Sequence, residues 1–94
     1  MICLKPKFTF YLQVIDCGDG YICLERASGY PDNESNLYKI DRNNNELWKA
    51  EFGGLWLMYC NLVLEGSVLK AYNGAGKATL NPNTGELIDW VLTK

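Results

Sequence analysis

The residue types that most often do chemistry are sparse in this chain. None of the 94 residues is histidine, which removes the side chain that most often serves as a general base near neutral pH or as a metal ligand. The four cysteines are Cys3, Cys17, Cys23 and Cys60, at spacings of 14, 6 and 37 positions. These spacings match neither a CxxC metal site nor a redox pair. We therefore expect reduced, buried thiols, with two disulfides as the alternative, and no catalytic, metal or cofactor site.

One acidic stretch has the outline of a calcium loop. Asp41, Asn43 and Asn45 occupy the first, third and fifth positions of such a loop. Its sixth position, however, is Glu46 where the loop needs glycine, and its twelfth is Phe52 where it needs a bidentate glutamate. We interpret the stretch as a turn in which the aspartate side chain accepts hydrogen bonds from nearby backbone amides.

The elements that would position any site are predicted to be strands. In the first segment, Phe8, Phe10, Leu12 and Val14 alternate with Lys7, Thr9, Tyr11 and Gln13, which is typical of a strand with two different faces. Further strands are expected at 21–26, 37–41, 46–52, 55–65, 67–72, 77–80 and 86–92, with a loop at 27–36 and a type I′ hairpin turn opening at Asn73–Gly74. No amphipathic helix pattern is present, so we predict an all-β fold.

The chain repeats itself after forty residues. "IDRNNNEL" at 40–47 aligns with "LNPNTGEL" at 80–87, and "ICLE" at 22–25 aligns with "LVLE" at 62–65. Asp41 and Asn81 are each predicted to close an Asx-turn, and Gly85 to supply the positive φ that reverses the chain, with Asn45 in its place in the first copy. We predict one domain, 1–94, that holds two repeat units at about 14–53 and 54–94.

The first copy, "NLYKIDRNNNELWKAEF", resembles the repeat of quinoprotein (PQQ)-type β-propellers, and "LNPNTGELIDW" is similar. The resemblance implies two antiparallel four-stranded blade-like sheets, as a propeller fragment or as a small sandwich or open barrel. Asn45 departs from the family's turn glycine. The likeness covers strand and turn positions, so it implies no quinone cofactor here.

Two blades leave apolar faces that must be covered, since each repeat buries its surface against its neighbours. One route is a ring closed by copies of the chain, as a homodimer of four blades or a homotrimer of six. The other route, which we favour, is packing of the two sheets on each other within one chain.

Composition narrows the partners. The chain is 48% hydrophobic and 13% aromatic, with a net charge of −2 and no basic run, so it lacks the positive surface through which proteins bind nucleic acids. No apolar stretch approaches the ~20 residues that cross a bilayer. We predict a cytoplasmic, non-enzymatic module that binds another protein, of the inhibitor or immunity type. The alternative is a small-ligand or carbohydrate binder.

Four residues are candidates for contact with a partner or ligand. Tyr30 and Asp32 lie in the polar loop 27–36, where a rigid sheet would present them. Trp56 and Trp90 are aromatic side chains that could stack on a ligand between the blades. Each has a plainer interpretation, as part of a solvated connector for the loop residues and of the core for the tryptophans.

Overall fold

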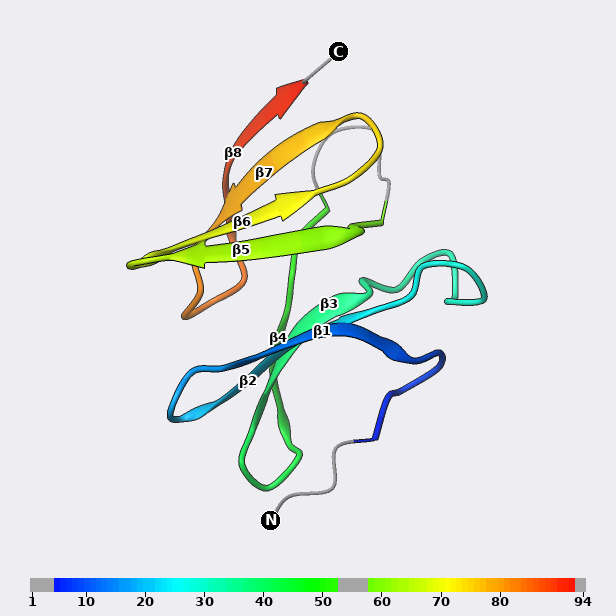
Figure 1. Cartoon of the computed structure of the whole chain (residues 1–94), viewed down its shortest axis with the longest axis vertical. Coiled ribbons are helices and arrows are strands. Elements are labelled where there is room, and N and C mark those ends of the chain that lie inside the picture. Colours follow the sequence, from blue (N-terminus) through cyan, green and yellow to red (C-terminus); the bar gives the residue numbers. More distant parts are fainter. Residues whose placement is uncertain (1–4, 53–57, 93–94) are drawn as a thin grey trace.

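The computed structural model describes residues 5–52 and 58–92. All regular structure in this part of the chain is β. The first sheet contains β1 (Tyr11–Asp16), β2 (Gly20–Glu25), β3 (Leu37–Asp41) and β4 (Glu46–Lys49), and the second contains β5 (Asn61–Glu65), β6 (Val68–Tyr72), β7 (Gly76–Leu80) and β8 (Leu87–Leu92). Each sheet is antiparallel and follows chain order (Figure 1). The prediction of an all-β fold with two four-stranded antiparallel sheets is confirmed.

Two local predictions are wrong. Of the apolar run predicted as a strand at 55–65, residues 55–57 lie outside the described part of the chain, and the described remainder is a strand only from Asn61 onward. The turn at Asn73–Gly74 is not of type I′, because neither residue has the positive φ which that turn requires. Instead the Asn73 side chain accepts hydrogen bonds from the amides of Ala75 and Gly76 at 2.8 and 2.9 Å. The asparagine thus makes the turn through its side chain.

One face of each sheet packs against the other sheet, and we call these the near faces. Because side chains alternate along a strand, every second residue contributes to the central core between them. The core takes Ile22, Leu24, Leu37 and Trp48 from the first sheet and Leu62, Leu69, Ala71, Ala78 and Leu80 from the second. The opposite surfaces are the far faces.

The two sheets stack front to back. Ile40 and Leu80 are corresponding residues, since each lies in the third strand of its sheet immediately before the Asp or Asn that caps the Asx-turn. Leu80 belongs to the central core, but Ile40 belongs to a separate cluster with Cys23 and Tyr38 on the far face of the first sheet. Corresponding faces therefore point the same way in both sheets, which is a head-to-tail contact of the kind that propagates a repeat.

Polar side chains hold the sheets in this arrangement. The Gln13 amide on β1 bonds both the backbone amide and the carbonyl of Leu62, at 2.8 and 3.1 Å, where β1 and β5 contact each other (Figure 1). The buried amide of Asn36 does the same for Tyr59, at 3.1 and 2.7 Å. These bonds satisfy backbone groups that have no strand partner, so they are costly to remove.

The two Asx-turns form as predicted, but with different lengths. The amides of Asn43 and Asn83 each donate to the side chain two residues earlier, at 2.8 Å. The first turn closes between Asp41 and Asn45, whereas the second closes between Asn81 and Glu86 and is one residue longer. The residue with positive φ in the first turn is consequently Asn44, at 68°, and not Asn45 as the forty-residue alignment predicted.

The forty-residue alignment also pairs strands that occupy different positions in their sheets. It places β2 on β5, yet β2 is the second strand of its sheet and β5 the first. The correspondence holds only for β3 with β7 and for β4 with β8. As a result Trp48 lies opposite Lys39, while Trp90 lies opposite Ala78. Both tryptophans still reach the central core, because front-to-back stacking brings opposite faces of the two sheets together.

Two independent features of the fold require glycine at position 85. It has a φ of 77°, and a Cβ built on it would lie 2.6 Å from the Trp48 ring. We expect Gly85→Ala to lower the free energy of unfolding by about 2 to 4 kcal/mol, through backbone strain plus overpacking. Urea unfolding measures this loss.

Gly66 provides a matched control. Its φ is also positive, at 59°, but nothing lies within 4 Å of a Cβ placed there. Gly66→Ala should therefore cost only the backbone term, about 1 to 2 kcal/mol. Equal losses for the two variants would contradict close packing of Trp48 on Gly85.

Candidate functional site

Residues 5–10 lie along the far face of the first sheet, and we call them the N-terminal strap. The strap is held by the carboxylate of Glu25, a fully buried residue. Its Oε1 accepts hydrogen bonds from the backbone amides of Phe8 and Thr9 at 3.0 and 2.9 Å. Its Oε2 accepts one from the backbone amide of Lys7 at 2.6 Å and another from the Tyr38 hydroxyl. Both oxygens are thus fully engaged.

These hydrogen bonds determine the pKa of the Glu25 carboxylate and whether it can act as a base. Burial alone would raise its pKa, but hydrogen bonds from Tyr38 and from the three strap amides outweigh burial and hold the pKa below its ordinary value. A general base needs a free lone pair within reach of a substrate proton. Glu25 has neither the lone pair nor the access, so its role in this site is to anchor the strap.

The surroundings of Glu25 are apolar and aromatic. Cys23 is buried beside it, and burial raises the pKa of this thiol to about 11. The hydroxyls of Tyr11 and Tyr30 are buried without a hydrogen-bond partner among the described residues, and burial raises the pKa of both. All these groups stay neutral near pH 7, which suits a packed layer rather than a reactive centre.

The strap and β1 carry a line of exposed apolar side chains, which we call the apolar stripe. Its members are Phe8, Phe10, Leu12 and Val14, which are between 39% and 54% exposed. The sequence pattern predicted that these four share a strand face, but the strand begins only at Tyr11 and a bulge follows it. Exposed large apolar side chains gathered in one short segment are candidates for an interaction site in a folded protein.

Two neighbours fix the aromatic rings of the stripe. Phe8 packs edge-on against Tyr30, with ring centroids 4.9 Å apart. The guanidinium of Arg26 lies over the Phe10 ring, 5.4 Å from its centroid, within the range of cation–π attraction. The stripe therefore combines aromatic rings with an adjacent arginine, the residue types that are enriched at protein interfaces.

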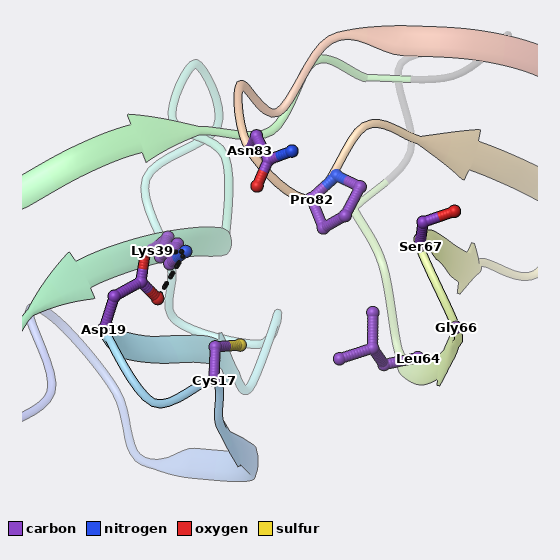
Figure 2. Close-up of a pocket in the computed structure, with 8 residues that line it drawn as sticks. All are labelled: Cys17, Asp19, Lys39, Leu64, Gly66, Ser67, Pro82 and Asn83. Carbon is purple, nitrogen blue, oxygen red and sulfur yellow. Dashed lines mark hydrogen bonds and ion pairs between the residues drawn. The ribbon is translucent and has the colours of Figure 1, made fainter.

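A cavity of about 320 Å³ opens between the two sheets (Figure 2). Its lining consists of Cys17, Asp19 and Lys39 from the first sheet and Leu64, Gly66, Ser67, Pro82 and Asn83 from the second. Figure 2 shows Lys39 paired with Asp19 on one side of the space and Leu64 on the opposite side, with the Ser67 hydroxyl directed away from the ion pair. Converging polar groups in a concave space are typical of small-ligand sites.

Lys39 is the unusual residue of this cavity. Its side chain is almost completely buried, whereas its partner Asp19 is exposed, with a Nζ–Oδ1 distance of 3.0 Å. The hydrogen bond and charge of Lys39 lower the pKa of Asp19, and burial raises the pKa of the nearby Cys17 thiol. The cavity thus presents a cation, a carboxylate, a hydroxyl and an amide, with a thiol that stays protonated at neutral pH.

A second cavity, of about 460 Å³, lies beside the loop 27–36 and is lined by Asn33, Ser35, Lys49, Ala50, Glu51, Phe52 and Leu87. Its charged groups already have partners. The Glu51 carboxylate accepts a hydrogen bond from the Leu87 amide at 2.6 Å, and Lys49 pairs with Glu34 at 2.9 Å. These bonds join the loop to β4 and the second sheet, so we interpret this cavity as structural.

The predicted contact residues do not form one site. Tyr30 is buried against the strap and Asp32 is exposed in the loop. Trp90 is half-buried at the central core, and Trp56 lies outside the described residues. The residues that pattern reasoning missed are Glu25 and Lys39, because nothing in the letters around either one signals a buried charge.

The cysteines are only partly as expected. Cys17, Cys23 and Cys60 are free thiols, but only Cys23 is fully buried, and Cys60 is exposed. Among residues 5–52 and 58–92, no three His, Cys, Asp or Glu side chains are grouped so as to hold a metal ion. The same residues contain no helix of the length and apolarity that crossing a bilayer demands.

The structure is therefore an all-β protein in which two antiparallel meander sheets stack front to back. A strap bound through its backbone amides covers the far face of the first sheet. Comparison with protein-family models, curated proteins and solved structures gave no match for the chain. The resemblance to quinoprotein-type propellers accordingly stays a prediction from the sequence.

Anchoring of the strap by Glu25 predicts a pH-dependent stability. Since the pKa of Glu25 is lower in the folded chain than in the unfolded chain, its stabilisation is present above the ordinary carboxyl pKa. The stabilisation is lost as the pH falls through the folded-state value. We expect Glu25→Gln to lower the free energy of unfolding at pH 7, and the difference from the wild type to shrink as the solution is acidified.

Denaturant unfolding of both proteins between neutral and acidic pH measures this difference. Asp19 and Asp41 also have lowered pKa values, but both variants retain them, so their contribution cancels. A difference between the two proteins that stays constant with pH would contradict a charged, hydrogen-bonded Glu25.

Proposed function

We propose that this chain is a non-enzymatic protein-interaction module that binds its partner through the apolar stripe. The observation that carries the proposal is the exposure of four large apolar side chains along one continuous segment, Phe8, Phe10, Leu12 and Val14. Single exposed apolar residues are ordinary on protein surfaces, but a contiguous row of them is not.

The support beneath the stripe favours binding. Val14 belongs to β1, which is paired along its length with β2, and the strap before it is tied to Glu25 by three backbone amides. A segment that is already ordered loses little conformational entropy when a partner docks. Phe10, with Arg26 stacked on its ring, has the composition of a binding hot spot.

The proposal includes a cytoplasmic setting and an inhibitor-like or immunity-like role. Its support is the set of three free thiols, Cys17, Cys23 and Cys60, which suits a reducing compartment. The net charge of −2 favours a protein partner over a nucleic acid, whose binding depends on clustered positive charge.

The stripe predicts where a partner can be cross-linked. With p-benzoylphenylalanine in place of Phe10, we expect irradiation of intact cells to give a discrete adduct larger than the chain, whose second component mass spectrometry identifies. The same photoprobe in place of Tyr72, on the far face of the second sheet, is the control and should give no such adduct.

Measuring the affinity of the identified partner for the purified chain then shows how much Phe10 contributes to binding. Phe10→Ala should weaken it about tenfold or more, as truncation of an aromatic hot spot does. The free energy of unfolding should change by less than about 1 kcal/mol, since the ring is half exposed. Equal cross-linking at both positions, or unchanged affinity, would refute the stripe as the binding surface.

The cavity between the sheets favours a second candidate function, the binding of a small polar molecule such as a sugar. Its hydrogen-bonding groups include the Lys39 ammonium, the Asp19 carboxylate and the Asn83 amide (Figure 2). A mixed set of donors and acceptors with one apolar wall, here Leu64, matches the two-sided chemistry of a sugar ring.

This candidate predicts a ligand-dependent thermal shift. Among a panel of monosaccharides and small polyols, at least one should raise the melting temperature of the wild type, because a ligand that binds the folded state stabilises it. Lys39→Met should abolish the shift. Lys70→Met, which removes an exposed lysine paired with Glu65, should retain it. An equal shift in both variants, or none in the wild type, rules this function out.

A further inference from the structure

β4 and β8, the last strand of each sheet, differ in how their open edges are protected. In the sheet orders, β4 ends the first sheet and β8 ends the second. β4 is four residues long and carries Glu46 and Lys49 at its ends. Short length and end charges are the usual protection of an edge strand against pairing with another chain.

β8 has little of this protection. It is six residues long, reads LIDWVL and has Asp89 as its single charge. Ile88 and Leu92 are 63% and 61% exposed, and Val91 is also exposed. A bulge between Leu87 and Asp89 interrupts its start, but the remainder is regular. Within the described residues, β7 is the strand hydrogen-bonded to β8. The Leu87 amide at the start of β8 is bonded by Glu51, so the open part of the edge that can receive a further strand is the part beyond it.

The far faces of the sheets do not provide an equivalent surface for self-association. The far face of the first sheet is covered by the strap. The far face of the second sheet carries the apolar side chains of Val63 and Val91, but the charged residues Glu65, Lys70, Lys77 and Asp89 lie among them. Charged residues on the outer face are typical of the terminal unit of a repeat stack. Ring closure through this face would bury those charges, so it is disfavoured.

We infer that two copies of this chain associate through antiparallel pairing of their β8 strands, making one eight-stranded sheet from the two second sheets. The contact is isologous, with a two-fold axis through the paired Trp90 residues. This occupant is favoured by the charge pattern, because a strand with one charge and five apolar residues is complementary to itself.

The charge also selects the register. An axis at Asp89 would place two carboxylates directly opposite each other, which is destabilising. An axis at Trp90 places Asp89 opposite the partner's Val91, and Ile88 opposite the partner's Leu92. This register pairs Ile88 with Leu92, the two most exposed apolar side chains of the strand. Because the shared area is at the small end of the interface range, we expect a dissociation constant on the order of 10–100 µM.

Analytical ultracentrifugation from low micromolar to millimolar concentration tests the association. The wild type should move from the 10.6 kDa of one chain towards twice that mass. Ile88→Lys should remain monomeric throughout. The control Leu47→Lys places the same substitution on β4, at a side chain that is 50% exposed, and should associate like the wild type.

Circular dichroism confirms that each variant is folded, and Leu92→Lys replaces Ile88→Lys should the latter unfold. A wild type that is monomeric at all concentrations overturns the inference. So does a dimer that survives Ile88→Lys, or one that is lost in Phe10→Ser, because the apolar stripe would then be the contact between copies.

Disulfide cross-linking tests the register. In a background with Cys3→Ser and Cys60→Ser, which removes the thiol outside the described residues and the exposed thiol among them, the variants Asp89→Cys and Val91→Cys should cross-link when mixed under oxidising conditions. Each variant alone should cross-link much less, since neither position is opposite itself. Efficient cross-linking of Asp89→Cys alone would place the axis at that residue and overturn the proposed register.

Discussion

The contact between the near faces is the interaction on which the rest of the structure depends. A four-stranded sheet with one apolar face is not stable alone, because that face must be removed from water. Here the two sheets cover each other, and the central core draws large side chains from both. Both the strap and the sheet edges are arranged around this contact.

Front-to-back stacking leaves two far faces that differ in polarity, and they are shielded from water to different extents. The second sheet ends in a charged face that water covers well. The first sheet ends in the aromatic cluster around Tyr38 and Cys23, which would be costly to expose. The strap covers this cluster in place of a third sheet. The burial of Glu25 beneath it is tolerated because hydrogen bonds satisfy both carboxylate oxygens.

Periodicity and turn chemistry predicted the class of the fold but not its details. Alternation identified the strands and Asp41 identified its Asx-turn, since both signals are local. The forty-residue alignment misplaced Asn44, because a one-residue difference in turn length is invisible until the backbone hydrogen bonds are known. It paired β2 with β5 because the connection from β2 to β3, 26–36, is much longer than the connection from β6 to β7, 73–75. Glu25 and Lys39 were missed for a related reason. Burial of a charge is decided by distant segments, the strap in one case and the second sheet in the other.

The way the strap is attached has a consequence for how the molecule can change. Glu25 holds the strap through main-chain amides, which every residue except proline possesses. The identities of Phe8 and Phe10 are therefore decoupled from the attachment itself. Substitutions there can alter which surface is recognised while the scaffold stays the same, so specificity is free to diverge between relatives, or under directed selection, independently of folding.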